Sequence, residues 1–191
     1  MTVRAGVLAL QGDFREHADA LRAAGARVGL VRTAADLDGV DALVIPGGES
    51  TTIGRLAERF GLIEPLRAAI EGGAAVLGTC AGMIFLASAT TGAPQAQLGM
   101  LDVVVERNAF GRQNDSFEAD LVVAGFDEPV RAVFIRAPRI VEVGPGVEVL
   151  AEVSGYPVMV RQGRLLATAF HPELTSDGRI PRMLLDLARE R

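Results

Sequence analysis

The chain of 191 residues contains one cysteine, Cys80, and no lysine. A lone cysteine cannot form an internal disulfide, which favours a reducing compartment, the cytoplasm. All 19 basic residues are arginine, so the chain has neither a lysine for a Schiff base nor the lysine of a phosphate-binding P-loop. Any imine chemistry connected with this protein must therefore take place on a partner.

The chain also lacks an apolar stretch long enough to span a membrane, and its N-terminus shows no signal-peptide pattern. The net charge of −5 gives no reason to expect nucleic acid or an anionic membrane surface as a partner. The length predicts a single domain, residues 1–191, with a sizeable core.

The first half of the chain alternates apolar runs with amphipathic segments. Strands are predicted at residues 5–10, 28–31, 42–45 and 74–77, and helices at about 13–24, 51–59, 63–71 and 83–87. Units of this kind form right-handed crossovers and a parallel sheet with helices on both faces. The strands are continuously hydrophobic, which agrees with burial on both faces of that sheet.

After about residue 99 the pattern changes to successive strands. They are predicted at residues 101–106, 117–123, 132–135, 148–153, 157–161 and 165–170, with turns at 156–157 and 162–163 and a last helix at about 180–189. The sequence therefore predicts an α/β fold whose central sheet is mainly parallel, with antiparallel additions from the C-terminal half.

The most informative segment is Gly-Thr-Cys-Ala-Gly at residues 78–82. This elbow between an apolar strand and a helix places a nucleophile at a helix N-terminus, where unpaired N–H groups favour a thiolate and an oxyanion. The two glycines leave space for a tight backbone and for a substrate. Cys80 is therefore the predicted nucleophile of an acyl-transfer enzyme, and papain-like and esterase-like chemistry are both open at this point.

A cysteine nucleophile needs a base, and the chain has two histidines. His171 ends a predicted strand, and Glu173 follows at a spacing that puts both side chains on the same side of an extended segment. Glu173 can therefore orient the imidazole. His17 lies in the first predicted helix without triad-like neighbours, and we expect it to be partly exposed and outside the site.

The carboxyl ends of the strands meet at one edge of such a sheet, where ligands bind. Gly47 and Gly48 follow the third predicted strand and can point N–H groups at an anion. Together with the N–H of Ala81 they predict an oxyanion hole. The alternative is an ordinary glycine turn, followed by a helix cap at Ser50 or Thr51.

Two arginines follow strand-like segments of the second half, Arg107 and Arg136. Arginine suits bidentate recognition of a substrate carboxylate. Either arginine taken alone is more typical of a surface position.

Taken together, these segments resemble the class I, triad-type glutamine amidotransferases, and in particular the glutaminase subunits of pyridoxal 5′-phosphate synthase, the PdxT/SNO family. Many amidotransferases share the elbow and the histidine–glutamate pair. More specific to this subfamily are Gly-Gly-Glu-Ser-Thr at 47–51, Arg-Asn-Ala-Phe-Gly-Arg-Gln at 107–113 and Phe-Ile-Arg-Ala-Pro at 134–138. The resemblance covers almost the full chain and implies a three-layer, flavodoxin-like fold.

The resemblance implies that Cys80 attacks the glutamine side-chain amide, that His171 moves protons and that Glu173 orients His171. It implies no cofactor and no metal. It also implies oxyanion-hole N–H groups from Gly48 and Ala81, and contacts to L-glutamine from Gly48, Glu49, Ser50, Arg107, Ile135 and Arg136.

The same resemblance implies a partner. The ammonia is expected to pass to a separate barrel-shaped synthase subunit within a large hetero-oligomer, and docking of that subunit is expected to activate a poorly active glutaminase. Gln11 and the loop after the first strand are candidates for a partner-facing element.

Two alternatives stay open. The elbow and the His-Pro-Glu segment also allow an amidotransferase of another pathway, such as histidine biosynthesis, or a γ-glutamyl hydrolase, although the segments at 107–113 and 134–138 argue against these. A catalytically inactive partner on the same fold is the other alternative. Intact Cys80, His171 and Glu173 argue against it.

Overall fold

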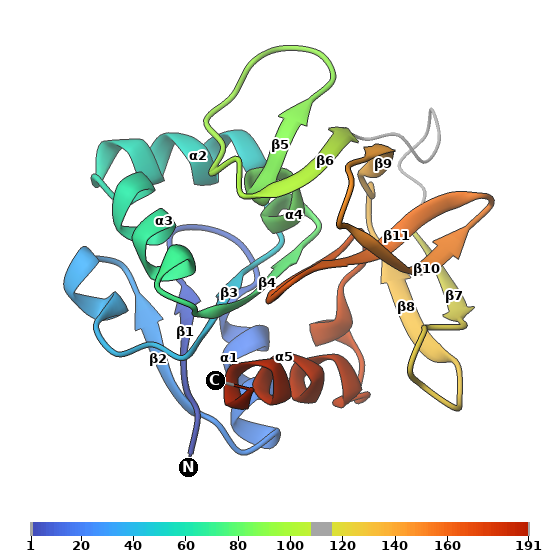
Figure 1. Ribbon diagram of the computed structural model, residues 1–191, viewed down its shortest axis with the longest axis horizontal. Coiled ribbons are helices and arrows are strands. Elements are labelled where there is room, and N and C mark those ends of the chain that lie inside the picture. The colour runs from blue at the N-terminus through green and yellow to red at the C-terminus, as the bar shows by residue number, and fades with distance from the viewer. Residues whose placement is uncertain (1, 108–115, 191) are drawn as a thin grey trace.

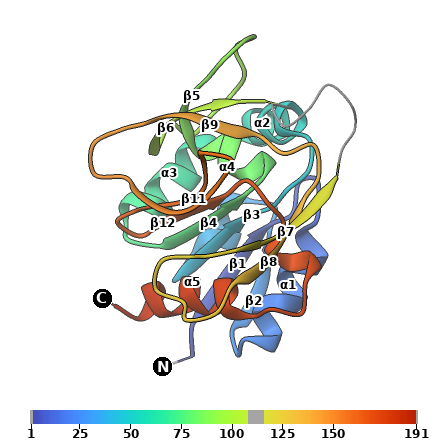
Figure 2. The same cartoon turned by 90° about the vertical axis from the view of Figure 1, so that its right-hand side faces the viewer.

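The computed structural model describes residues 2–107 and 116–190. The fold is built around a central seven-stranded sheet (Figures 1 and 2). Its strands are β1 (Arg4–Leu8), β2 (Arg27–Val31), β3 (Ala42–Ile45), β4 (Ala75–Thr79), β10 (Glu148–Val153), β11 (Tyr156–Gln162) and β12 (Leu165–Thr168). They lie in the order β10-β11-β12-β4-β3-β1-β2. Neighbours from β12 to β2 pair in parallel, and β10 and β11 are antiparallel additions. The predicted sheet type is confirmed.

Helices cover both faces of this sheet and complete three layers (Figure 1). One face carries α1 (Phe14–Ala23) and α5 (Arg179–Arg189), and the other carries α2 (Ser50–Arg59), α3 (Ile63–Glu71) and α4 (Ala81–Leu86). Short 3₁₀ helices follow β2 and β12, as η1 (Ala34–Leu37) and η2 (Pro172–Leu174). Every residue of β3 and β4 is buried, because both strands lie between the two helical layers. Within the described ranges no helix is long and apolar enough to cross a bilayer.

Five further strands form two small sheets beside the central one. The first contains β5 (Ala87–Thr90), β6 (Leu101–Glu106) and β9 (Arg139–Val143), and the second pairs β7 (Phe117–Leu121) with β8 (Val130–Phe134). Of these strands, β6, β7 and β8 were predicted, and their expected place in the central sheet is wrong. β6 and β8 alternate buried with more exposed residues, so each strand buries only one face, whereas β3, β4 and β12 of the central sheet bury both.

Three local predictions also need correction. β5 was not predicted, because Ala-Ser-Ala-Thr carries little strand signal and its pairing with β6 comes from tertiary contact. β9 was not predicted either, although it is rich in β-branched residues; two of its valines, Val141 and Val143, lie exposed. The turn expected at 156–157 lies instead at Ser154 and Gly155, whose φ angles of 53° and 79° suit a two-residue hairpin.

Candidate active site

Cys80 lies in the sharp turn between β4 and α4, with φ 49° and ψ −104°. A positive φ is strained for a residue with a side chain, at a cost of about 1–3 kcal/mol, and must be held by its surroundings. The Cys80 N–H donates to the Thr168 carbonyl of β12 at 2.8 Å, and the Ile84 N–H donates to the Cys80 carbonyl at 3.2 Å. The thiol is almost fully buried. The strand–nucleophile–helix arrangement therefore has the geometry that the elbow sequence predicts.

The two glycines of the elbow allow close packing of backbone against backbone. A Cβ on Gly82 would lie 1.9 Å from the carbonyl oxygen of Ile45, and one on Gly78 would lie 2.8 Å from the carbonyl oxygen of Gly82. Neither glycine has a positive φ. Their role is thus to let α4 approach β3 and β4, rather than to leave space for a substrate.

His171 and Glu173 form a short, buried pair. His171 Nδ1 lies 2.7 Å from Glu173 Oε1, and both residues are less than a tenth exposed. The His171 N–H donates to the Val133 carbonyl at 2.9 Å, so β8 holds the backbone of His171. This bond explains how a small sheet outside the central one positions the candidate base.

The predicted reason for the pair is wrong in its local geometry. β12 ends at Thr168, and Glu173 lies in η2 rather than in an extended segment. Pro172 at the first position of this 3₁₀ helix fixes the turn between the two side chains. The imidazole and the carboxylate meet because the chain turns after His171, not because they share one side of a strand.

Burial and hydrogen bonding act in opposite directions on this pair. Burial disfavours both charged forms. Hydrogen bonds with Asp13, Cys80 and Glu173 outweigh that effect for the imidazolium and raise the pKa of His171 well above 6.5. The close polar contact with His17 and the hydrogen bond from His171 outweigh it for the carboxylate and lower the pKa of Glu173 to about 2. These contacts favour the imidazolium form of His171 and the carboxylate form of Glu173.

Two residues at the beginning of α1 join this cluster and were not predicted. Asp13 Oδ2 lies 3.4 Å from His171 Nδ1, and His17 Nε2 lies 3.2 Å from Glu173 Oε2. His17 is 2% exposed, so its predicted place outside the site is wrong. The four-residue spacing of Asp13 and His17 puts both on one side of the first helical turn, but such a spacing is common in amphipathic helices and does not by itself distinguish a site.

Asp13, His171 and Glu173 also place one potential ligand atom each within 4.8 Å of one another. Their nearest contacts are with each other, since His171 Nδ1 faces both carboxylates. This arrangement suits a hydrogen-bonded relay rather than a dedicated metal centre.

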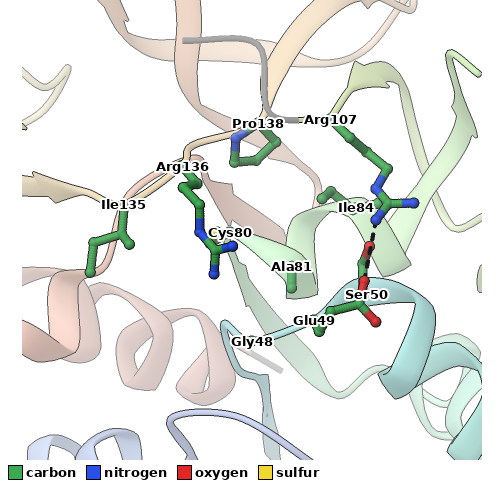
Figure 3. A pocket seen from close by; sticks show the side chains of 10 residues that line it. All are labelled: Gly48, Glu49, Ser50, Cys80, Ala81, Ile84, Arg107, Ile135, Arg136 and Pro138. Carbon is green, nitrogen blue, oxygen red and sulfur yellow. Dashed lines mark hydrogen bonds and ion pairs between the residues drawn. The ribbon is translucent and has the colours of Figure 1, made fainter. Parts of the chain in front are cut away.

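Cys80 opens onto a cavity of about 180 Å³ (Figure 3). This is smaller than the roughly 300–1,000 Å³ of pockets for drug-sized ligands. Its wall contains Gly48 and Ala81 of the predicted oxyanion hole, but not Gly47, and every residue predicted to contact glutamine. Ile84 and Pro138 also line it and were not predicted. The full lining is Gly48, Glu49, Ser50, Cys80, Ala81, Ile84, Arg107, Ile135, Arg136 and Pro138. Residues 108–113 of the arginine segment lie outside the described residues.

Side chains reach this cavity from both small sheets. Arg107 follows β6, and residues 135–138 connect β8 to β9. Arg136 has φ 44°, a strained value that directs this connection toward Cys80 (Figure 3). The small sheets therefore complete the wall that faces the elbow.

Glu49 performs two tasks at the cavity edge. Its carboxylate accepts hydrogen bonds from the N–H groups of Thr51 and Thr52 at 3.2 and 2.7 Å, so Glu49 caps α2, where Ser50 or Thr51 was expected to do so. It also pairs with Arg107 at 3.2 Å (Figure 3). Partial burial opposes ionisation, but hydrogen bonds from Thr52 and Thr51 lower the pKa of Glu49.

The glycine turn lies directly beside the elbow. Gly48 has φ 145°, a conformation that favours glycine. Gln11 Oε1 accepts a hydrogen bond from the Glu49 N–H at 2.7 Å, so the side chain of Gln11 supports this turn. The oxyanion hole of Gly48 and Ala81 stays a prediction, with both residues on the cavity wall.

A strained cysteine elbow, a buried histidine–glutamate pair and a glycine turn, all at the carboxyl edge of a parallel sheet, define a triad-type glutamine amidotransferase. The comparisons agree. Residues 7–186 match the model of the SNO glutamine amidotransferase family, and the chain belongs to this family.

Similar proteins cover nearly the whole chain. A pyridoxal 5′-phosphate synthase subunit PdxT from Parafrankia sp. (strain EAN1pec) is 62% identical over 189 residues, covering 97% of this chain and 93% of the relative. The PdxT subunit of Thermus thermophilus is 57% identical over 185 residues, with 96% of each chain covered. A crystal structure of a glutamine amidotransferase superposes with a TM-score of 0.93 at 53% identity, covering 97% of this chain and 98% of the other. The family predicted from the sequence, its fold and its glutaminase class are confirmed.

Proposed function

We propose that Cys80 hydrolyses L-glutamine through a γ-glutamyl thioester. Cys80 reacts as a thiolate whose proton is held by His171. The sulfur attacks the side-chain amide carbon, the N–H groups of Gly48 and Ala81 hold the oxyanion, and the His171 imidazolium passes its proton to the nitrogen that leaves as ammonia. His171 then takes a proton from water, whose oxygen displaces the sulfur and frees glutamate. Glu173 stabilises the imidazolium that is present before the proton passes to nitrogen and that forms again when His171 takes a proton from water.

One observation carries this proposal. The candidate nucleophile opens onto a single small cavity that is lined by every residue predicted to contact glutamine, and the His171–Glu173 pair lies behind it. Arg107 and Arg136 offer guanidinium groups for the carboxylate of the substrate. Glu49 and Ser50 offer acceptors for its ammonium group.

The ammonia is passed to a synthase subunit that makes pyridoxal 5′-phosphate. The names of the relatives support this partner, and so does the absence of lysine, because imine chemistry then belongs to another chain. We propose a barrel-shaped acceptor in a large hetero-oligomer that also activates the glutaminase. A cytoplasmic location suits the single reduced cysteine, and a hydrophobic core shared by both halves of the chain supports one domain, residues 1–191.

Glutamate release with and without the synthase subunit tests this function. We expect the synthase to stimulate release and Cys80→Ala to abolish it. Undiminished release by Cys80→Ala would exclude the nucleophile, and stimulation only by a different acceptor synthase would assign another pathway. Failure of a glutamine analogue to label Cys80 in the assembled complex would favour an inactive partner.

A further inference from the structure

The buried imidazole of His17 has two polar neighbours from other parts of the chain. Its Nε2 lies 3.0 Å from Thr79 Oγ1 of β4 and 3.2 Å from Glu173 Oε2 of η2. The His17 side chain is 3% exposed and the Glu173 side chain is fully buried. α1 thus brings a polar ring against the carboxylate of the His171–Glu173 pair.

The two oxygens of Glu173 differ in their partners. Oε1 faces His171 Nδ1 at 2.7 Å. Oε2 lies at ion-pair distance from His17 Nε2, although the contact is less well aligned than a full hydrogen bond, and Oε2 has no other hydrogen-bond partner among the described residues. A buried carboxylate oxygen without a donor costs about 1–3 kcal/mol or more. His17 is therefore the group that makes an ionised Glu173 tolerable at this place.

The chemistry of the contact also determines which nitrogen of His17 carries a proton. An ionised carboxylate only accepts hydrogen bonds. A lone pair on Nε2 would face the lone pairs of Oε2, whereas an Nε2–H can be shared between Oε2 and Thr79 Oγ1. The surroundings thus favour the ring form that donates toward Glu173.

We propose that His17 is a positioning residue of the glutaminase site, which acts on His171 through Glu173. It fixes the carboxylate so that Oε1 meets Nδ1 of His171 and the imidazole keeps its orientation. The resulting relay, from His17 through Glu173 and His171 to Cys80, contains one member more than a triad. The contribution of His17 to the lowered pKa of Glu173 agrees with this role. This inference rests on the proposed function.

The test compares variants of His17 whose side-chain amide lies at different distances from the backbone. Gln can place its side-chain N–H near the position of Nε2, whereas Asn is one methylene shorter and cannot. Leu removes the donor altogether. With the assembled synthase complex we expect His17→Leu and His17→Asn to lower kcat roughly 10–100-fold, the size seen for partners that orient functional histidines. We expect KM for glutamine to change less than about twofold, and His17→Gln to stay within about threefold of the wild type.

A double-variant cycle separates positioning from general damage to the fold. If His17 acts through Glu173, His17→Leu should cost almost nothing further in a Glu173→Gln background. An independent loss of about tenfold or more in that background would overturn the proposal, as would full activity of both His17→Leu and His17→Asn. If His17→Leu does not fold, the comparison of kcat between His17→Gln and His17→Asn decides whether His17 acts as a donor to Glu173. Loss of activity in Cys80→Ala checks the underlying glutaminase function separately.

Discussion

Gly47 and His171 are packed so closely that no side chain fits between them. A Cβ on Gly47 would lie 2.4 Å from Cε1 of His171 and 3.0 Å from Oδ2 of Asp13. The imidazole cannot yield easily, because Glu173 and Asp13 hold its Nδ1. The glycine turn beside the elbow therefore also determines where the candidate base lies.

Gly47→Ala should lower kcat and should also lower the free energy of unfolding. The added methyl group would push the imidazole out of line with Cys80, and we expect kcat for glutamine to fall at least about tenfold, with a loss of roughly 1–3 kcal/mol in the free energy of unfolding. Glutaminase kinetics and urea unfolding measure both. The control is Gly29→Ala in β2, where a Cβ meets nothing within 4 Å. Unchanged kcat in Gly47→Ala would show that His171 can move without cost.

Arg107→Met should weaken substrate binding. If the guanidinium binds the carboxylate of glutamine, its loss removes a charge-assisted hydrogen bond worth about 1.5–3 kcal/mol, so we expect KM to rise roughly 10–100-fold. Steady-state kinetics measure the change. Arg131→Met, which removes an exposed arginine that pairs with Glu118 and Asp120, is the matched control. Equal kinetics of the two variants would exclude Arg107 from binding.

Glu49 variants should separate the helix cap from the ion pair with Arg107. Glu49→Ala loses the bonds to Thr51 and Thr52 and should lower the free energy of unfolding by about 1 kcal/mol. Glu49→Asp can still cap α2, since Asp is a preferred capping residue, but it is too short to keep the contact with Arg107. Thermal or urea unfolding should therefore rank the wild type and Glu49→Asp above Glu49→Ala. Equal stability of all three chains would contradict the capping role.

The stability of the protein should depend on pH through Glu173. Because folding lowers the pKa of this carboxyl from 4.5 to about 2, its ionised form contributes stability above pH 4.5 that is lost as the pH falls toward 2. The difference in unfolding free energy between wild type and Glu173→Gln should shrink by up to about 1.4 kcal/mol per pH unit in this window. Urea unfolding below pH 4.5 measures it, with Glu71→Gln, at the exposed end of α3, as the control. A constant difference would contradict the lowered pKa.

Much of the fold followed from local patterns. The continuous apolar runs predicted β3 and β4 and their place inside a parallel sheet, because only strands buried on both faces omit the polar alternation. The two small sheets could not be predicted from local patterns. β5 and β9 carry weak or exposed patterns, and their pairing depends on partners from other parts of the chain. Strand pairing of that kind is decided by tertiary contact rather than by propensity.

The residues of the candidate site also fall into those that the sequence predicts and those that it does not. The residues at the elbow and the glycine turn could be named because close backbone approach at a helix N-terminus limits the choice of residue, and that limit is visible in sequence. His17 could not be found, since a single histidine on an amphipathic helix has no distinguishing pattern. Its role depends on a carboxylate 156 positions later in the chain, Glu173.

The sequence by itself determined the chemistry and the family: one cysteine in an elbow, a histidine followed by a glutamate, and no lysine. Only the tertiary structure decided which groups surround them. The packing of α1 against η2 brings Asp13 to the candidate base and His17 to Glu173, and the small sheets bring Arg107 and Arg136 to the cavity. The physical reason is that local sequence restricts backbone geometry, whereas contacts between distant segments arise only when the layers pack.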